Sequence, residues 1–450
     1  MLPYPWTGRL ASAALCCMAP LAAWSQASPY ALSVFQTVTY QPNVFQVPDG
    51  QARTRDFISS TGVNFGVTRE FDGLTAFANG NAQANVYQDS KALNNPSYGI
   101  NLGLTSTVER LSSTLRYAAS QNIGDYGTPG VQPTTERNLQ TNQEAALALR
   151  YRMTPRTNLV GGLGYQSLAF SASAFDAQEN SSAVATIDVT HQLNPALTLG
   201  AGVRYSNGVT PRYAAGPTPG SFIADRFDGR YLDLLASWEP GATHLVRARL
   251  SLTRTEHTQA TQLDFTGITG GISWTYTPST RTSLFAALTQ NTGSGPTLFS
   301  PVVQGTGAGT PTGGSGAGGG SGSGTGSGGG SGAGGGAGAG GGSVPLGNDN
   351  NNRLNTTLTL GGNYQLTRTI GVNANLSVNN GDLVDSSGAS GHAWTSTLGL
   401  GLTYAPTRAI TLGCNLSVAL QTANESTEAA GLASSYRSPT ASCTGTFSFF

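Results

Sequence analysis

Histidines, cysteines and charged residues are the side chains of this chain that could carry chemistry. The four histidines, His191, His244, His257 and His392, lie far apart, and none has a companion at the spacing of a metal site or a catalytic triad. A Ser–His hydrolytic pair would need one of them beside a serine, and the many serines single out none. We therefore expect no enzyme, no bound metal and no cofactor.

Charged side chains recur on one face of segments in which apolar residues occupy every second position. In residues 138–153, Leu147, Leu149 and Tyr151 share one face, so that Arg150 and Arg152 share the other. Nine residues are assigned to such polar faces: Glu144, Arg150, Arg152, Asp188, Arg204, Asp233, Glu239, Arg247 and Arg249. Arginines and carboxylates in such a set can line a water-filled pore and tune its selectivity, or form ion pairs between neighbouring strands.

These residues belong to about eighteen segments of alternating hydrophobicity, which run from 29–40 to 436–450. The segment 196–206 carries Arg204, and 226–239 carries Asp233 and Glu239. An aromatic residue often ends the apolar face just before a polar turn, as at Tyr151, Trp238, Tyr276, Tyr364 and Tyr404. Aromatic residues at this point are typical of the girdle at a membrane interface.

The connections between the segments alternate in length. Tight turns such as "REFD", "LNPA" and "APTR" alternate with longer polar stretches such as 122–137, 207–225, 381–392 and 423–435. Strands in lipid must close into a barrel, because every backbone group needs a partner. We therefore predict an all-β fold, a transmembrane antiparallel up-and-down barrel of about 18 strands with short periplasmic turns and long extracellular loops.

Cys414 and Cys443 fall on the last two predicted strands. Antiparallel pairing of position 422 with 436 places Cys414 opposite position 443 or 444. Both cysteines share a face if Phe447 and Phe449 point outward. A cross-strand disulfide between Cys414 and Cys443 and a pair of free thiols both remain open.

Two segments of unusual composition are predicted to be a cleaved signal peptide and a loop. Arg9, the apolar run "LASAALCCMAPLAAW" and the small residues "SQA" predict a cleaved secretory signal over residues 1–27. Residues 28–450 then form the outer-membrane barrel. The Gly-rich stretch 305–343 is expected to be a flexible extracellular insertion, either a tolerated loop tip or a mobile gate.

Composition and the final residue indicate the partners. Only 10% of the residues are charged and the formal net charge is zero, which argues against nucleic acid as a partner. The apolar face predicts contact with lipid of the bacterial outer membrane. The terminal aromatic residue Phe450 predicts recognition by the barrel assembly machinery.

The first part of the predicted barrel carries a family resemblance. An opening strand ends in "TYQPNVF", a polar loop leads to "RDFISSTGVNFGV", and a hairpin turns at "REFDG". These elements resemble β-barrel porin family two, which includes EpsL-type outer-membrane proteins associated with exopolysaccharide. In architecture the resemblance covers the whole chain after the signal. It implies passage of a polysaccharide across the outer membrane, together with periplasmic export partners.

Three functions follow as expectations. The first is a channel for exopolysaccharide export, the second a general diffusion porin for small solutes, and the third a structural or adhesive surface barrel. Aromatic side chains along the inner wall would favour the polymer, because sugar faces pack on aromatic rings. Alternation places few aromatic residues inside, with Tyr231 among them.

Overall fold

The computed structural model describes residues 29–131, 133–292, 352–384 and 389–449. The predicted signal at 1–27, the Gly-rich stretch 305–343 and Phe450 lie outside these residues. The strands are β1 (Tyr30–Gln41), β2 (Asp56–Phe71), β3 (Leu74–Tyr87), β4 (Asn95–Val108), β5 (Leu111–Ile123), β6 (Leu139–Arg152), β7 (Thr157–Phe170), β8 (Asn180–Asn194), β9 (Leu197–Ala215), β10 (Phe222–Trp238), β11 (His244–His257), β12 (Phe265–Ser279), β13 (Thr282–Asn291), β14 (Asn352–Gln365), β15 (Ile370–Val384), β16 (Ser390–Tyr404), β17 (Ile410–Ala423) and β18 (Tyr436–Phe449).

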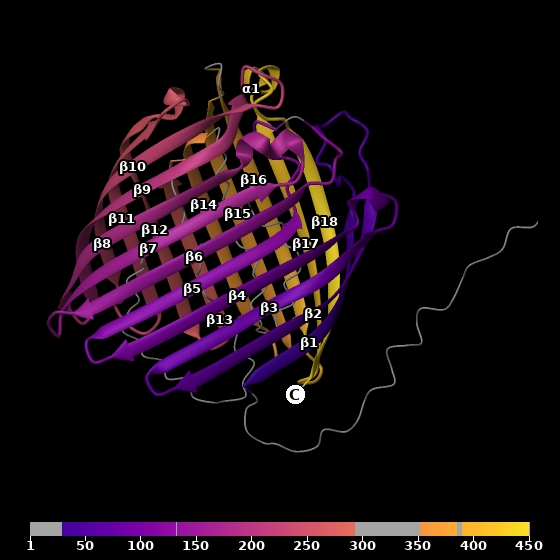
Figure 1. The fold of residues 1–450 in the computed structure, drawn as a ribbon. Helices are drawn as coiled ribbons and strands as arrows, with labels where there is room; N and C mark the ends of the chain where they lie inside the picture. Colours follow the sequence, from indigo (N-terminus) through magenta and orange to yellow (C-terminus); the bar gives the residue numbers. More distant parts are fainter. Residues whose placement is uncertain (1–28, 132, 293–351, 385–388, 450) are drawn as a thin grey trace, which may run out of the picture.

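These eighteen described strands form one closed antiparallel barrel (Figure 1). Each strand pairs with its neighbours in sequence, and β1 closes the sheet by pairing with β18 from Leu32↔Phe449 to Tyr40↔Ala441. Closure leaves no strand edge unpaired. The predicted fold class, an antiparallel up-and-down barrel of about 18 strands, is confirmed.

The period-2 alternation of the sequence becomes an apolar outside and a polar inside. On β16, Leu398, Leu400 and Leu402 are each about half exposed on the outer face, whereas Thr397, next to Leu398, is 8% exposed on the inner face. A strand must alternate its side chains between the two faces of the sheet, so the leucine spacing alone decides the orientation. The outer wall is therefore a belt of exposed Leu, Val, Ile and aromatic side chains.

The two rims of the barrel differ as predicted. Short turns such as 72–73, 109–110 and 195–196 lie at the rim that also holds the end of β18, and the longer connections lie at the other rim (Figure 1). Exposed outer aromatics, including Tyr151, Trp238, Tyr364 and Tyr404, end the strands at the short-turn rim.

The predicted strand bounds differ from the observed ones most clearly at β9 and β10. β9 continues to Ala215 instead of ending at 206, and β10 begins at Phe222 and ends at Trp238, not at 239. The additional residues pair with each other from Phe222↔Ala215, with an irregularity between Ile223 and Asp225. Backbone pairing needs no apolar alternation, so this extension beyond the apolar belt carries no period-2 signal.

The short helical segments lie at the long-loop rim. They are η1 (Lys91–Leu93), η2 (Ser173–Gln178), η3 (Thr261–Leu263) and α1 (Glu425–Ala429). No helix in the described residues has the length and apolar character needed to cross a membrane.

Candidate functional site: the inner wall and the mouth

The inner wall consists largely of small polar side chains, several of which hydrogen-bond to one another. Thr253 and Thr269 on neighbouring strands have hydroxyl oxygens 2.6 Å apart, and the Ser60 hydroxyl donates to Asn85 Oδ1 at 2.7 Å. Paired hydroxyl and amide groups keep the cost of burying polar atoms low. Small side chains also leave the interior of a barrel of this strand number open.

A compact charged cluster stands on the inner wall across β8 to β11, and we call it the wall cluster. The strand register brings its four members together: Asp188 and Asp233 both lie opposite Gly202 of β9, and Arg204 lies two residues further along β9. Arg249 of β11 lies within electrostatic range of the other three. Four of the nine predicted residues are therefore neighbours in the barrel, although each lies on a different strand.

Arg204 is the centre of the wall cluster. Its Nε and Nη2 donate to the two carboxylate oxygens of Asp233 at 3.1 and 3.3 Å, and Nη2 also reaches Ser251 Oγ at 3.4 Å. The guanidinium carbon lies 3.9 Å from the centroid of the Tyr231 ring. Both charged side chains are only 5% exposed. This bidentate, stacked arrangement is specific to arginine.

Gly202 allows the two carboxylates to approach each other. A Cβ atom at this position would lie 1.8 Å from Asp188 Oδ1, so the Asp188 side chain occupies the space above the glycine. Two acids in one site repel each other, and Arg204 and Arg249 balance that repulsion. The wall cluster thus holds two positive and two negative groups.

The other predicted residues lie elsewhere on the wall. Glu144, Arg150 and Arg152 share the inner face of β6, and Arg152 sits at the short-turn rim, where it donates to the Glu109 carbonyl at 3.4 Å. Arg247 lies on the inner face of β11, opposite Ser237.

Glu239 departs from its predicted place. It lies exposed in the turn after Trp238, and its amide donates to the Ala196 carbonyl at 2.7 Å. The strand ends one residue early because the chain turns at Pro240 and Gly241.

Several inner residues are absent from the predicted set. Arg116 on β5 lies opposite Gly103 on the inner face, between the outward residues Leu115 and Tyr117. Four phenylalanines also face inward, each packed against a glycine of the neighbouring strand: Phe35, Phe77, Phe227 and Phe285. Only the strand register reveals their glycine partners.

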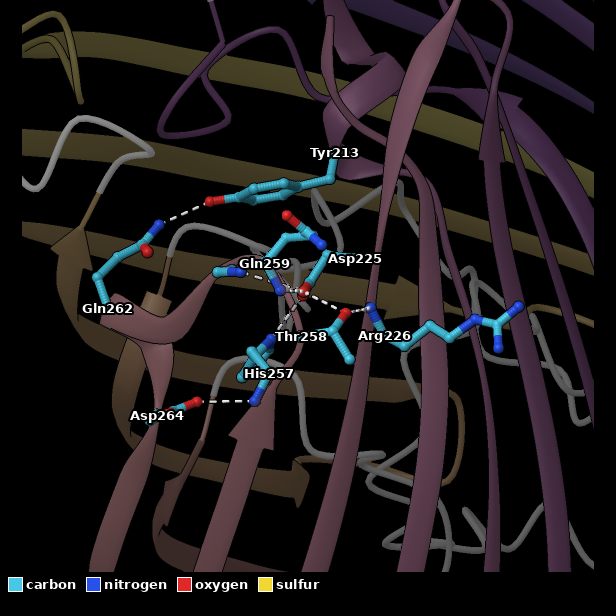
Figure 2. Close-up of polar contacts among 9 residues, drawn as sticks. Tyr213, Asp225, Arg226, His257, Thr258, Gln259, Gln262 and Asp264 are labelled. Atoms are coloured by element: carbon cyan, nitrogen blue, oxygen red, sulfur yellow. Dashed lines mark hydrogen bonds and ion pairs between the residues drawn. The ribbon is translucent and has the colours of Figure 1, made fainter. Parts of the chain in front are cut away.

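At the mouth, the loop between β11 and β12 is fastened by the carboxylate of Asp225 (Figure 2). Asp225 Oδ1 accepts the amides of Gln259 and Ala260 at 2.7 and 3.1 Å, and Oδ2 lies 2.6 Å from His257 Nδ1. Asp264 Oδ1 accepts the His257 amide at 2.7 Å. We call this arrangement the β11–β12 latch.

A second latch of the same design fastens the loop between β3 and β4. Asp56 accepts the amides of Gln88, Asp89 and Ser90 at 2.7–3.1 Å, and Asn94 Oδ1 accepts the Tyr87 amide at 2.8 Å. Each latch contains a three-residue 3-10 turn with a buried leucine, Leu93 or Leu263. Tyr87 occupies the position in this latch that His257 occupies in the β11–β12 latch. The segment β2–β4 therefore repeats as β10–β12, eight strands further around the barrel.

The loops beside the β3–β4 latch share an apolar core. Val44, Tyr126, Ala172 and Phe175 are buried together with Leu93, from four different loops. The loop between β17 and β18 joins this group through backbone bonds, with Asp49 N donating to Ser435 O at 2.9 Å. These loops therefore pack together as one unit at the long-loop rim.

Asp125 lies within this unit and predicts a pH dependence of stability. Burial raises the pKa of the Asp125 carboxyl, and the bonds from Gly127 N and Gln46 only partly offset it. The folded pKa thus exceeds the unfolded value of about 3.9. The parent barrel should lose stability as the pH rises from that value through the folded pKa.

Asp125→Asn should remove this loss. Urea unfolding between pH 3 and 7 should give equal stability for the variant and the parent at the acid end and a more stable variant at pH 7. A parent that is more stable than the variant at pH 7 would contradict the assignment.

Cys414 and Cys443 are direct cross-strand partners on the outer face of β17 and β18. The structure joins them by a disulfide with a Cα–Cα distance of 4.1 Å. Phe447 and Phe449 share that outer face and are 38% and 41% exposed. Among the described residues, no group of three or more His, Cys, Asp or Glu side chains could hold a metal ion.

No family model and no curated protein matches the sequence. Among solved structures, the chain is similar to the outer membrane protein OpdK of Pseudomonas aeruginosa, with 10% identity over 93% of this chain and 99% of that one and a TM-score of 0.44. It is also similar to OccAB4 of Acinetobacter baumannii, with 11% identity, 93% and 98% coverage and a TM-score of 0.43.

Proposed function

We propose that this barrel crosses the bacterial outer membrane and forms a water-filled channel for small polar solutes. The outer belt of exposed apolar residues supports the location, because such a surface is stable in lipid and costly in water. Exposed aromatics at both ends of the strands, such as Tyr404 and Trp394 on β16, fit the two interfaces of a bilayer. The polar inner wall supports a water-filled interior.

The observation that carries the channel proposal is the charged inner wall. Four neighbouring strands, β8 to β11, carry charged residues on the inner face. These residues are Asp188, Arg204, Asp233, Arg247 and Arg249. Asp188, Asp233 and Arg204 are at most 6% exposed, whereas Arg247 and Arg249 are partly exposed and meet a solute that passes this wall. Such a lining favours polar and charged solutes over apolar ones.

The experiment that tests it is electrical recording in planar lipid bilayers. The parent barrel should conduct ions, and the double variant Arg247→Gln/Arg249→Gln should shift the reversal potential in a salt gradient toward cation selectivity, because two positive charges leave the wall. The matched control is Arg226→Gln/Arg230→Gln, which removes two exposed arginines from the outer face of β10. Unchanged selectivity in the inner variant, or an equal shift in the control, would contradict the proposal.

A second candidate is passage of exopolysaccharide. Its support is the resemblance to the EpsL-type family and the four inward phenylalanines, which exceed the few inner aromatics expected from alternation and offer apolar faces to sugar rings. A channel reserved for a polymer can be closed to ions in its absence. A parent barrel that inserts into the bilayer and conducts no ions would therefore favour this second candidate over the small-solute channel.

A further inference from the structure

A concave site of about 550 Å³ lies on the outside of the barrel near the long-loop rim. It is lined by Asn380, His392, Trp394, Thr422, Ala423 and Asn424. The register explains the grouping: Trp394 of β16 lies directly opposite Asn380 of β15 and directly opposite Thr422 of β17. Three adjacent strands thus place an aromatic residue between an amide and a hydroxyl.

Trp394 presents an open aromatic surface to this site. Its side chain is 50% exposed. Other exposed aromatics of the outer face, such as Tyr165 and Tyr205, do not line the cavity. A residue that served only as an interfacial anchor would need no such hollow beside it. The position of Trp394 therefore indicates a contact with a molecule that fills the cavity.

The amide of Asn380 supplies a second, independent indication. Its Oδ1 atom is buried and has no hydrogen-bond partner among the described residues. A buried acceptor without a partner costs about 1–3 kcal/mol, a cost that rotation of the amide toward the cavity and a ligand donor there would remove. Asn424 borders the same cavity, and its Oδ1 accepts the Thr427 amide at 3.1 Å, which holds the side chain in place at the start of α1.

The charges near the cavity compensate each other. Asp382 accepts from Arg353 Nη2 at 2.7 Å and lies 3.8 Å from His392 Nδ1. No uncompensated acid or base among the lining residues would select an anion or a cation. An aromatic face flanked by amides and a hydroxyl, with no net charge, suits a ligand that has an apolar face and hydroxyl groups at its edge.

We propose that this site binds a neutral sugar ring, with one face of the ring on the Trp394 indole and a hydroxyl group donating to the Asn380 amide oxygen after that side chain rotates toward the cavity. The sugar belongs either to the headgroup of an outer-leaflet glycolipid or to a free saccharide at the cell surface. This outer site does not depend on whether the interior conducts solutes.

The test is calorimetric titration of the detergent-solubilised barrel with two probes, maltohexaose and the deacylated sugar portion of lipopolysaccharide. At least one probe should bind the parent. Trp394→Ala and Asn380→Leu should each weaken binding about tenfold, the equivalent of one lost contact of about 1.4 kcal/mol. Trp394→Phe should retain part of the affinity, because it keeps an aromatic face.

Trp238→Ala is the matched control, since Trp238 is an equally exposed outer tryptophan at the opposite rim. Its binding should equal that of the parent, and heat-modifiable gel migration should show every variant folded. Binding of the lipopolysaccharide sugar alone assigns the site to a glycolipid headgroup, whereas binding of maltohexaose assigns it to free saccharide as well. No binding of either probe, or equal binding by Trp394→Ala and the parent, overturns the proposal.

Discussion

Replacing Arg204 with methionine is expected to lower the free energy of unfolding by about 3–5 kcal/mol, the usual cost of removing one partner from a buried ion pair. The variant leaves Asp233 without its two bonds, at 3.1 and 3.3 Å, in a place where the side chain is only 5% exposed. It also leaves Asp188 and Asp233 side by side over Gly202 with Arg249 as the remaining cation of the wall cluster. Urea unfolding in lipid vesicles, followed by tryptophan fluorescence, measures the change.

Arg254→Met is the matched control for this experiment. Arg254 pairs with Glu256 on the outer face of β11 at 2.5 Å, but the two side chains are 60% and 44% exposed. Solvent screens such a pair, so its loss should change stability by about 1 kcal/mol or less. Arg204→Met/Asp233→Leu should be more stable than Arg204→Met alone, because no unpaired acid of the pair remains. Equal losses of unfolding free energy in Arg204→Met and Arg254→Met would contradict the claim that burial makes the Arg204–Asp233 pair more important for stability.

Replacing Asp225 with alanine is expected to open the loop between β11 and β12. The amides of Gln259 and Ala260 lose their acceptor, and His257 Nδ1 loses its partner. Two unsatisfied backbone donors cost on the order of 3 kcal/mol, so amide exchange over 258–264 should accelerate roughly 100-fold. Hydrogen exchange read by mass spectrometry measures this segment by segment.

The second latch provides the control for the first. Asp56→Ala should accelerate exchange over 88–94 and leave 258–264 unchanged, and Asp225→Ala should do the reverse. Asp225→Asn keeps Oδ1 as an acceptor for both amides and should have a smaller effect than alanine. Acceleration of both loops in Asp225→Ala would indicate a general loosening of the barrel and would refute the local latch.

The repeat of the latch suggests how the mouth of the barrel keeps its shape. Both copies use a carboxylate on one strand to hold the loop that follows the next strand, and both bury a leucine in the turn. The copies lie eight strands apart in a barrel of eighteen, nearly opposite each other. Loops anchored from two sides leave the described part of the mouth little freedom to collapse into the interior.

The sequence by itself determined the barrel and the orientation of its wall. Alternation in "TLGLGLTY" already separates Leu398, Leu400 and Leu402 from Thr397, and the same rule turns Arg204, Arg247 and Arg249 inward. This works because a strand has only two faces, and a charged side chain in lipid is too costly to be placed at random. The sorting of short turns from long loops depends only on counting residues between alternating segments, so the strand number and the closed antiparallel fold could be predicted from it.

The tertiary structure alone decided which side chains meet. The pairing of Arg204 with Asp233 depends on the register between β9 and β10, which in turn depends on the paired extension Ala215↔Phe222 and its irregularity near Asp225. Glu239 lies outside the inner wall because β10 ends one residue earlier than predicted. The latches and the Trp394 site join residues from different strands and loops, and no period in the sequence reports such contacts, because register, turn geometry and loop packing are properties of the assembled barrel.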